Sequence, residues 1–209
     1  RVVPYGITMQ EYLSAERKPF LTEKLSDKSA VKVFFTGRLV YYKGADLLLK
    51  AFRRVKNCEL FIAGTGVLEQ QLKDYARAKG LDGKVHFLGF LPDEQLKQSY
   101  ADCDIFVLPS TVKSEAFGIV QLEAMVYGKP VINTNLASGV PCVSLDGVTG
   151  ITVPPSDEKA LAAAINKLAQ DSALRGEYGR NAEKRVREQF SEENVIKRLY
   201  SVLTEGVNI

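Results

Sequence analysis

The chain has 209 residues, of which 45% are hydrophobic and 25% charged, which excludes a disordered chain and suits one large globular domain or two small ones. The net charge of +3 arises from interspersed basic and acidic side chains, so no nucleic-acid partner is expected. No apolar run reaches 18 residues, no stretch has the pattern of a signal peptide, and the three cysteines lack CxxC spacing. We therefore expect a cytoplasmic protein without disulfides or a zinc site.

Residues 1–29 are predicted to be a connecting segment more than part of a core. They hold a turn at Pro4-Tyr5-Gly6 and a polar stretch around Lys18-Pro19. The chain begins in mid-pattern and without an initiating methionine. We therefore expect these residues to come from a longer protein, with the ordered domain beginning near residue 30.

From Val31 to Val153, apolar runs typical of strands alternate with stretches of helical spacing. The predicted strands cover residues 31–36, 59–63, 85–88, 104–109, 131–133 and 151–153, and the helices cover about 46–55, 68–79, 93–101 and 118–127. This alternation predicts an α/β fold with a doubly wound, parallel, Rossmann-like sheet. Ligands bind such sheets outside the carboxyl ends of the strands, so the loops 37–44, 64–66, 89–91 and 109–118 should share one rim.

After Val153 the sequence predicts helices only. Ser156 or Asp157 can cap a helix that runs to about Gln170, and further helices are expected over 174–189 and 192–205. The second of these helices carries a basic cluster interspersed with glutamates, formed by Arg180, Lys184, Arg185 and Arg187. Two interpretations stay open, a solvated helix face and a peripheral contact with anionic lipid or an acceptor.

The rim loop after the first strand carries two cations, Arg38 and Lys43, between Gly37 and Gly44. A planar guanidinium together with a mobile ammonium suits a diphosphate, although both are also ordinary surface cations. Tyr41 and Tyr42 precede Lys43 and are predicted to pack or to line the cleft.

Two carboxylates, Glu115 and Glu123, are separated by seven residues after the fourth strand. Glu115 should lie in the loop before a helix, and Glu123 one to two turns into it, roughly 7 to 9 Å along the axis. A ligand that reaches both must be elongated and lie across the helix N-terminus, which favours negative charge. A nucleoside diphosphate joined to a sugar has this shape; the alternative is two solvated glutamates.

Other rim residues give weaker signals. Gly64-Thr65-Gly66 follows a strand, but Glu69 stands where a dinucleotide fingerprint needs its third glycine, so the glycines indicate a tight turn and close backbone approach. Phe90 and Leu91 follow Gly89, where they either pack or stack against a nucleobase. The single histidine, His86, lies within a predicted strand and is assigned a structural role.

Several of these motifs, in this order, resemble those of the carboxy-terminal domain of family 4 retaining glycosyltransferases with the GT-B fold. The Glu115/Glu123 pair in Glu-Ala-Phe-Gly context is the most specific, and nearly the whole chain is covered. The other motifs are Gly37-Arg38, Lys43-Gly44, Gly64-Thr65-Gly66, Val85 to Gly89, Leu108-Pro109-Ser110, Gly128 to Val131 and Thr149-Gly150. Val3 to Ile7 and Ser138 to Pro141 resemble bacterial mannosyl- and rhamnosyl-transferases of surface polysaccharide and lipopolysaccharide synthesis.

The resemblance implies transfer of a hexosyl group, with retained configuration, from a nucleotide-diphosphate sugar to a glycan or lipid-linked acceptor. It implies that Arg38 and Lys43 bind the diphosphate and that Glu123 binds the ribose. Glu115 would orient the transferred sugar. The backbone N–H groups of Phe117, Gly118 and Ile119 would address the sugar and phosphate, and Gly37, Gly64, Gly66, Phe90 and Leu91 complete the expected donor site.

The resemblance also implies a domain plan and its limits. Residues 1–29 become the interdomain connection, 30–190 the nucleotide-sugar domain, and 191–209 a terminal helix that packs toward an amino-terminal acceptor domain. No metal or cofactor is expected, and the 209 residues alone are expected to bind donor without transferring sugar. GDP-mannose and a UDP-hexose stay open as donors, and a non-catalytic nucleotide-binding module and a nucleotide-sugar epimerase are the alternative functions.

Overall fold

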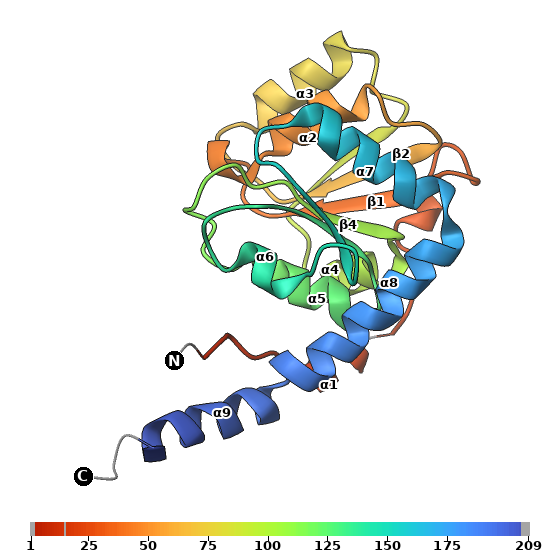
Figure 1. Ribbon diagram of the computed structural model, residues 1–209. Coiled ribbons are helices and arrows are strands. Elements are labelled where there is room, and N and C mark those ends of the chain that lie inside the picture. Colours follow the sequence, from red (N-terminus) through yellow and green to blue (C-terminus); the bar gives the residue numbers. More distant parts are fainter. Residues whose placement is uncertain (1–2, 15, 206–209) are drawn as a thin grey trace.

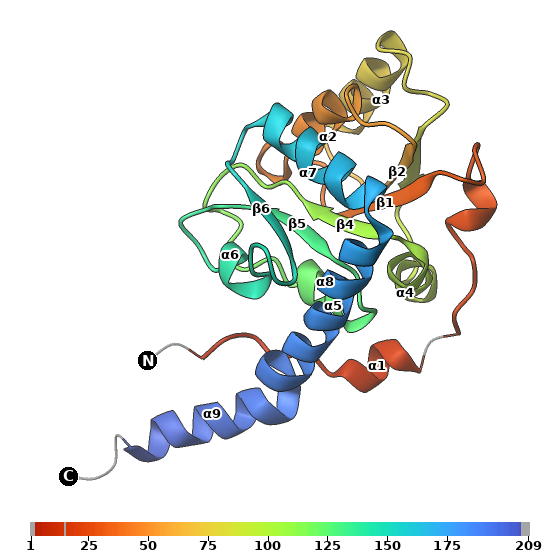
Figure 2. The same cartoon turned by 45° about the vertical axis from the view of Figure 1, so that its right-hand side comes forward.

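A six-stranded sheet forms the centre of the computed structural model, which describes residues 3–14 and 16–205. All neighbouring strands are parallel, in the order β3-β2-β1-β4-β5-β6 (Figure 2). The strands are β1 Val31–Thr36, β2 Cys58–Ala63, β3 Val85–Gly89, β4 Ile105–Leu108, β5 Val131–Thr134 and β6 Gly150–Val153. The predicted fold class is confirmed, and every strand boundary lies within one residue of its prediction.

Helices connect successive strands, precede β1 and follow β6, and they cover both faces of the sheet. They are α1 Met9–Leu13, α2 Ala45–Phe52, α3 Glu69–Ala78, α4 Asp93–Asp102, α5 Val120–Val126, α6 Val140–Val143, α7 Glu158–Gln170, α8 Ser172–Arg185 and α9 Glu192–Glu205, with short 3₁₀ turns η1 Thr22–Lys24 and η2 Tyr41–Lys43. Helices α2, α3 and α7 lie over one face, and α4, α5 and α6 lie over the other (Figure 1).

Three helix predictions need correction. Helix α2 ends at Phe52 rather than near Val55, because the chain turns at residues 53–54. Helix α5 begins at Val120 rather than near Gly118, because Gly118 has a backbone φ of +71°, which an α-helix does not allow. The predicted helix over 174–189 is not one regular α-helix, since α8 ends at Arg185 and continues as a π-helical turn, η3, at Val186–Phe190. The short helices α1 and α6 were not predicted from the sequence.

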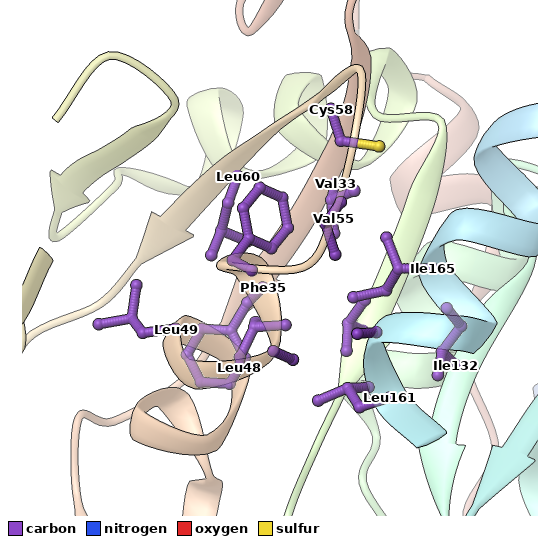
Figure 3. Packing of buried hydrophobic residues seen from close by; sticks show 14 of the residues in the cluster. Val33, Phe35, Leu48, Leu49, Val55, Cys58, Leu60, Ile132, Leu161 and Ile165 are labelled. Carbon is purple, nitrogen blue, oxygen red and sulfur yellow. The ribbon is translucent and has the colours of Figure 1, made fainter. Parts of the chain in front are cut away.

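Each face of the sheet has its own hydrophobic core. Against α2 and α7, the strand residues Val33, Phe35 and Leu60 pack with the helix residues Leu48 and Ile165 (Figure 3). The opposite core contains Phe34, Phe61 and Phe106 from the same strands, together with side chains of α4, α5 and α6. Because β1, β2, β4 and β5 are largely buried on both faces, their sequences are predominantly apolar rather than alternating, with polar exceptions such as Lys32 and Glu59.

The described part of residues 1–29 is more closely packed than a connecting segment requires. Leu21 is fully buried and Leu25 nearly so, both in the core on the α4 side. The carboxylate of Asp102, at the end of α4, accepts hydrogen bonds of 2.7 Å from the backbone N–H groups of Leu21 and Thr22. The sequence did not predict this packing, because Asp102 lies 81 residues from Leu21 and 80 from Thr22 along the chain. The role of the segment as a connection between domains stays a prediction.

The two outer segments of the chain meet at Ile7. The N–H of Ile7 donates to the carbonyl of Phe190 at 2.8 Å, and the N–H of Glu192 donates to the carbonyl of Ile7 at 3.2 Å. From this junction α9 projects away from the sheet (Figures 1 and 2). Residues 206–209 of the predicted terminal segment lie outside the described residues. Among the helices described, none is long and apolar enough to cross a membrane.

Of the two predicted caps of α7, Ser156 and Asp157, the structure uses Asp157, whose carboxylate accepts hydrogen bonds of 2.9 Å from the N–H groups of Lys159 and Ala160. We expect Asp157→Ala to lower the free energy of unfolding by about 1 kcal/mol, because two N–H groups lose their acceptor. Urea denaturation measures the difference. Asp157→Asn keeps an acceptor and serves as the control, so equal losses from both substitutions would contradict this assignment.

Candidate functional site

The candidate site lies where the strand order reverses, between β1 and β4. The chain builds β2 and β3 on one side of β1 and then returns to place β4, β5 and β6 on the other side. The connections leaving β1 and β4 therefore diverge to opposite faces, and the crevice between them is where open α/β sheets bind ligands. These connections are the loops 37–44 and 109–119, which contain most of the predicted site residues.

Gly44 brings the two loops into backbone contact. It has a φ of +73°, and a Cβ at this position would lie 2.0 Å from the carbonyl oxygen of Pro109. Nearby, the N–H of Thr111 donates to the carbonyl of Tyr42 at 2.9 Å. Only glycine combines this conformation with this close approach, so Gly44 sets the distance between the loop that carries Lys43 and the loop that carries Glu115.

Lys43 and Glu115 form an ion pair across this junction. The Nζ of Lys43 lies 2.6 Å from the Oε2 of Glu115, which also accepts a hydrogen bond of 3.1 Å from the Oγ of Ser110. The side chains of Lys43 and Glu115 are only 14% and 9% exposed. A buried carboxylate needs such partners, because an unpaired buried charge is strongly destabilising. The sequence placed both residues at the rim but did not predict their direct contact, nor the part of Ser110.

Arg38 lies beside this pair, on the exposed side of the same loop. Its Nη2 donates to the hydroxyl oxygen of Tyr42 at 2.9 Å, and the Nζ of Lys43 lies 5.6 Å from the centre of the Tyr42 ring. No carboxylate is paired with Arg38 among the described ion pairs, so its charge stays available to an anion. Arg38 and Lys43 therefore give this rim a positive edge with Tyr42 between them.

A pocket of about 230 Å³ lies next to Arg38, at the ends of β1, β2 and β3. It brings together five of the predicted site residues, Gly37, Arg38, Gly64, Phe90 and Leu91, with Thr36, Ala63, Thr65 and Leu96. Phe90 is 77% exposed, whereas Leu91 is buried. The interpretation that Phe90 packs in the core is therefore wrong. The same holds for Tyr41, which is 69% exposed.

The glycines of the second rim loop serve close backbone packing, as predicted. A Cβ on Gly64 would lie 2.0 Å from the carbonyl oxygen of Gly37, and one on Gly66 would lie 2.4 Å from that of Leu39. The N–H of Leu39 donates to the carbonyl of Thr65 at 2.9 Å. The loops after β1 and β2 are therefore held together, which fixes the floor of the pocket.

Glu123 lies one turn into α5 and is held by two tyrosines. Its Oε1 accepts a hydrogen bond of 3.1 Å from the hydroxyl of Tyr12, and its Oε2 accepts one of 2.5 Å from the hydroxyl of Tyr100. Glu123 is partly buried and does not line the pocket at Arg38. The sequence found the carboxylate but missed both tyrosines, because Tyr100 looks like an ordinary helix residue and Tyr12 lies in the supposed connecting segment.

The loop between Glu115 and α5 leaves backbone donors unpaired. The N–H groups of Phe117, Gly118 and Ile119, which the sequence predicts to be donor-site groups, have no acceptor within the described residues. The Phe117 ring lies 5.4 Å from that of Tyr5 and 6.1 Å from that of Phe190, so the N-terminal segment and η3 support this loop.

Other candidate residues are structural. The Nε2 of His86 lies 2.5 Å from the Oε2 of Glu59, a buried carboxylate that also accepts from the N–H groups of Ser26 and Asp27. Burial raises the pKa of the thiols of Cys58 and Cys103 to about 12, so neither is a reactive thiolate at neutral pH. Within residues 3–14 and 16–205, no three His, Cys, Asp or Glu side chains are placed to hold a metal ion.

Most side chains of the basic cluster, which lies on α8 and η3, contact carbonyl or carboxylate oxygens of the same chain. Arg185 donates to the carbonyls of Val143 and Cys142 at 2.8 and 2.7 Å, and Arg187 pairs with Glu183 at 2.8 Å. Lys184 lies 3.9 Å from a carboxylate oxygen of Glu188. These contacts favour the interpretation of a solvated helix face, while contact with anionic lipid stays a prediction.

Comparison with known proteins gives consistent matches. The family model described as glycosyl transferases group 1 matches residues 17–185. The D-rhamnosyltransferase WbpZ of Pseudomonas aeruginosa is 38% identical over 197 residues, covering 91% of this chain and 49% of the relative. The O-antigen chain mannosyltransferase C of Escherichia coli is 32% identical, covering 98% of this chain and 55% of the relative. The chain thus spans about half the length of the curated relatives it matches.

Solved structures share the fold. The chain matches Anabaena Alr3699/HepE, crystallised in complex with UDP, with a TM-score of 0.87 and 25% identity, covering 98% of this chain and 57% of that one. The crystallised C-terminal domain of the group 1 glycosyl transferase LpcC from Francisella tularensis matches with a TM-score of 0.77 and 23% identity, covering 90% of this chain and 100% of that one. The latter likeness concerns the fold alone.

Proposed function

Because the chain belongs to the glycosyl transferases group 1 family, we propose that it is the donor-binding part of a retaining hexosyltransferase. The proposed reaction moves a mannose-like hexosyl group from a nucleoside diphosphate to a glycan or lipid-linked acceptor of surface polysaccharide. The observation that carries the proposal is the buried pair of Lys43 and Glu115 at the point where the strand order reverses, with Arg38 beside it.

Each charged group has a proposed task. Lys43 and Arg38 bind the diphosphate and stabilise the negative charge that develops on it as the glycosidic bond breaks. Glu115 orients the hydroxyl groups of the sugar, since its carboxylate is already fixed by Lys43 and Ser110. The free N–H groups of Phe117, Gly118 and Ile119 add donors on the same side.

The nucleoside has a proposed place next to these charges. The base lies in the pocket beside Arg38, where the exposed Phe90 ring and Leu91 offer an apolar surface for stacking. The ribose hydroxyls donate to Glu123. We propose that binding needs no metal ion, because the two cations neutralise the diphosphate. The removal of divalent ions with EDTA should therefore leave the affinity unchanged.

The nucleotide itself has two candidates. The resemblance of this sequence to mannosyl- and rhamnosyl-transferases favours a GDP-linked sugar, whereas a solved structural relative was crystallised with UDP. A non-catalytic module of the same fold is the alternative function, and it would bind nucleotide without contributing to transfer. We propose that the 209 residues bind the donor but need an acceptor-binding domain for transfer.

Isothermal titration of the chain with UDP, GDP and ADP tests the proposal. We expect saturable binding of UDP or GDP, with at least about tenfold weaker binding of the matching monophosphate, because the second phosphate forms the charge-assisted contacts. The monophosphates UMP and GMP are the matched controls. Absence of binding by all three diphosphates would refute the donor site, and sugar transfer by the chain alone would refute its dependence on a second domain.

A further inference from the structure

The two tyrosines on Glu123 come from parts of the chain far from the carboxylate in sequence. Tyr100 lies on α4, 23 residues before Glu123, and Tyr12 lies on α1, 111 residues before it. Each hydroxyl donates to a different carboxylate oxygen, so both oxygens of Glu123 are held by a hydrogen bond. No cation pairs with Glu123 among the described ion pairs, so two neutral donors are the only partners that the described contacts give its carboxylate. Packing alone does not explain this arrangement.

The carboxylate of Glu123 still has acceptor positions that the two tyrosines do not use. A carboxylate has about four acceptor positions, two on each oxygen. Tyr12 uses one position on Oε1 and Tyr100 uses one on Oε2, which leaves one on each oxygen. The vicinal 2′- and 3′-hydroxyls of a ribose present two donors at a matching spacing. Two fixed donors therefore orient Glu123 to accept two further hydrogen bonds from a diol.

We propose that Tyr100 and Tyr12 are positioning residues, which hold the carboxylate of Glu123 in the orientation that recognises the ribose diol of the donor nucleotide. The inference rests on the proposed function, because it concerns the same site. It adds that the site extends into the N-terminal segment: α1 supplies one of the two groups that orient the ribose-binding carboxylate.

Both tyrosines are themselves held in place. Tyr100 is fully buried, with its ring 5.3 Å from that of Phe34 and 5.6 Å from that of Phe106. Tyr12 is fixed by Tyr127, whose hydroxyl donates to the Tyr12 carbonyl at 2.6 Å and whose ring lies 6.4 Å away. A group that orients another must itself be locked by packing, and both tyrosines satisfy this condition.

Both phenols also stay hydrogen-bond donors at neutral pH. Burial, and then the negative charge of Glu123, raise the pKa of Tyr100 and that of Tyr12 above the ordinary value of a tyrosine. A phenolate would repel the carboxylate, whereas a phenol donates to it. The two partners of the Glu123 carboxylate are therefore neutral hydrogen-bond donors, and its remaining lone pairs can accept from hydroxyl groups.

Ribose discrimination is the readout that a purely structural role would not change. We define it as the ratio of the dissociation constant of dUDP to that of UDP, or of dGDP to that of GDP, measured by calorimetry on the whole chain. We expect a ratio of about 10 for the unmodified chain, and of about 1 for Glu123→Ala. Tyr100→Phe and Tyr12→Phe should each lower the ratio at least about threefold, because the deoxynucleotide has only its 3′-hydroxyl to lose at Glu123, whereas the ribonucleotide loses two contacts.

Tyr178→Phe is the matched control, because Tyr178 is a buried tyrosine in the core on the opposite face of the sheet. It should leave the ratio unchanged. If Tyr100→Phe does not fold, the partly exposed Tyr12 still decides the question. Unchanged ratios in folded Tyr12→Phe and Tyr100→Phe would overturn the proposal.

The remaining outcomes separate this inference from the proposed function. Tighter UDP or GDP binding by Tyr12→Phe would mean that Tyr12 competes with the ribose, which overturns its assigned role. Nucleotide binding with a ratio near 1 in the unmodified chain refutes the inference and leaves the proposed function intact. Absence of all nucleotide binding refutes both.

Discussion

Lys43→Ala is expected to weaken the binding of UDP or GDP, whichever the chain prefers, by about 10- to 100-fold. A charge-assisted hydrogen bond contributes about 1.5 to 3 kcal/mol, and each 1.4 kcal/mol corresponds to a factor of ten in affinity. The loss has a second source, because Glu115 then lies near the diphosphate without its cationic partner at 2.6 Å. Calorimetric titration of both proteins measures the effect.

Two further variants separate the site from general charge effects. Lys50→Ala removes a lysine from α2 that pairs with Asp46 at 2.9 Å and is 45% exposed, so it should change the affinity little. Glu115→Gln should bind the nucleoside diphosphate at least as tightly as the unmodified chain, because it frees the Lys43 ammonium for the phosphates. Equal affinities of Lys43→Ala and Lys50→Ala would show that the diphosphate binds elsewhere.

Gly44→Ala is expected to lower the free energy of unfolding by about 3 kcal/mol or more. A left-handed conformation costs an ordinary residue about 1 to 3 kcal/mol, and here the added Cβ also meets the carbonyl oxygen of Pro109 at 2.0 Å. The two loops must separate to relieve this contact. Thermal and urea unfolding measure the loss, and nucleotide affinity should fall with it because Lys43 and Glu115 move apart.

Gly80→Ala isolates the contribution of backbone conformation. Gly80 has a similar φ of +65°, but a Cβ there would meet no atom within 4 Å. It should therefore cost only about 1 kcal/mol and leave nucleotide binding unchanged. Equal destabilisation by the two alanines would mean that the contact with Pro109 has no energetic role.

Much of the fold could be predicted from the sequence because local patterns determine it. The strands are predominantly apolar runs bounded by glycine or proline, as at Leu108-Pro109, and a parallel sheet buried on both faces has this signature. Residue type and position narrowed the cap of α7 to Ser156 or Asp157, and the structure shows Asp157 in this role. Where local conformation departed from the pattern, the boundaries were wrong. At Gly118 this is because periodicity does not report the sign of φ, and in η3 it is because apolar spacing does not distinguish a π-helical turn from an α-helix.

The candidate site was predicted residue by residue but not as a set of contacts. The sequence placed Lys43 and Glu115 on one rim, yet their ion pair depends on the approach of two backbones at Gly44, which no spacing encodes. Tyr12 and Tyr100 escaped notice for the same reason. Their partner, Glu123, is reached only through the packing of α1 and α4 against α5.

The junction at Ile7 makes the two outer segments of the chain depend on each other. The N–H of Ile7 donates to the carbonyl of Phe190, and the carbonyl of Ile7 accepts from the N–H of Glu192. If either segment detaches, backbone polar groups of the other segment lose their hydrogen-bond partners. The two segments should therefore detach and reattach as one cooperative unit. Because α1 carries Tyr12, this local unfolding would break the hydrogen bond from Tyr12 to Glu123 while the sheet stays intact.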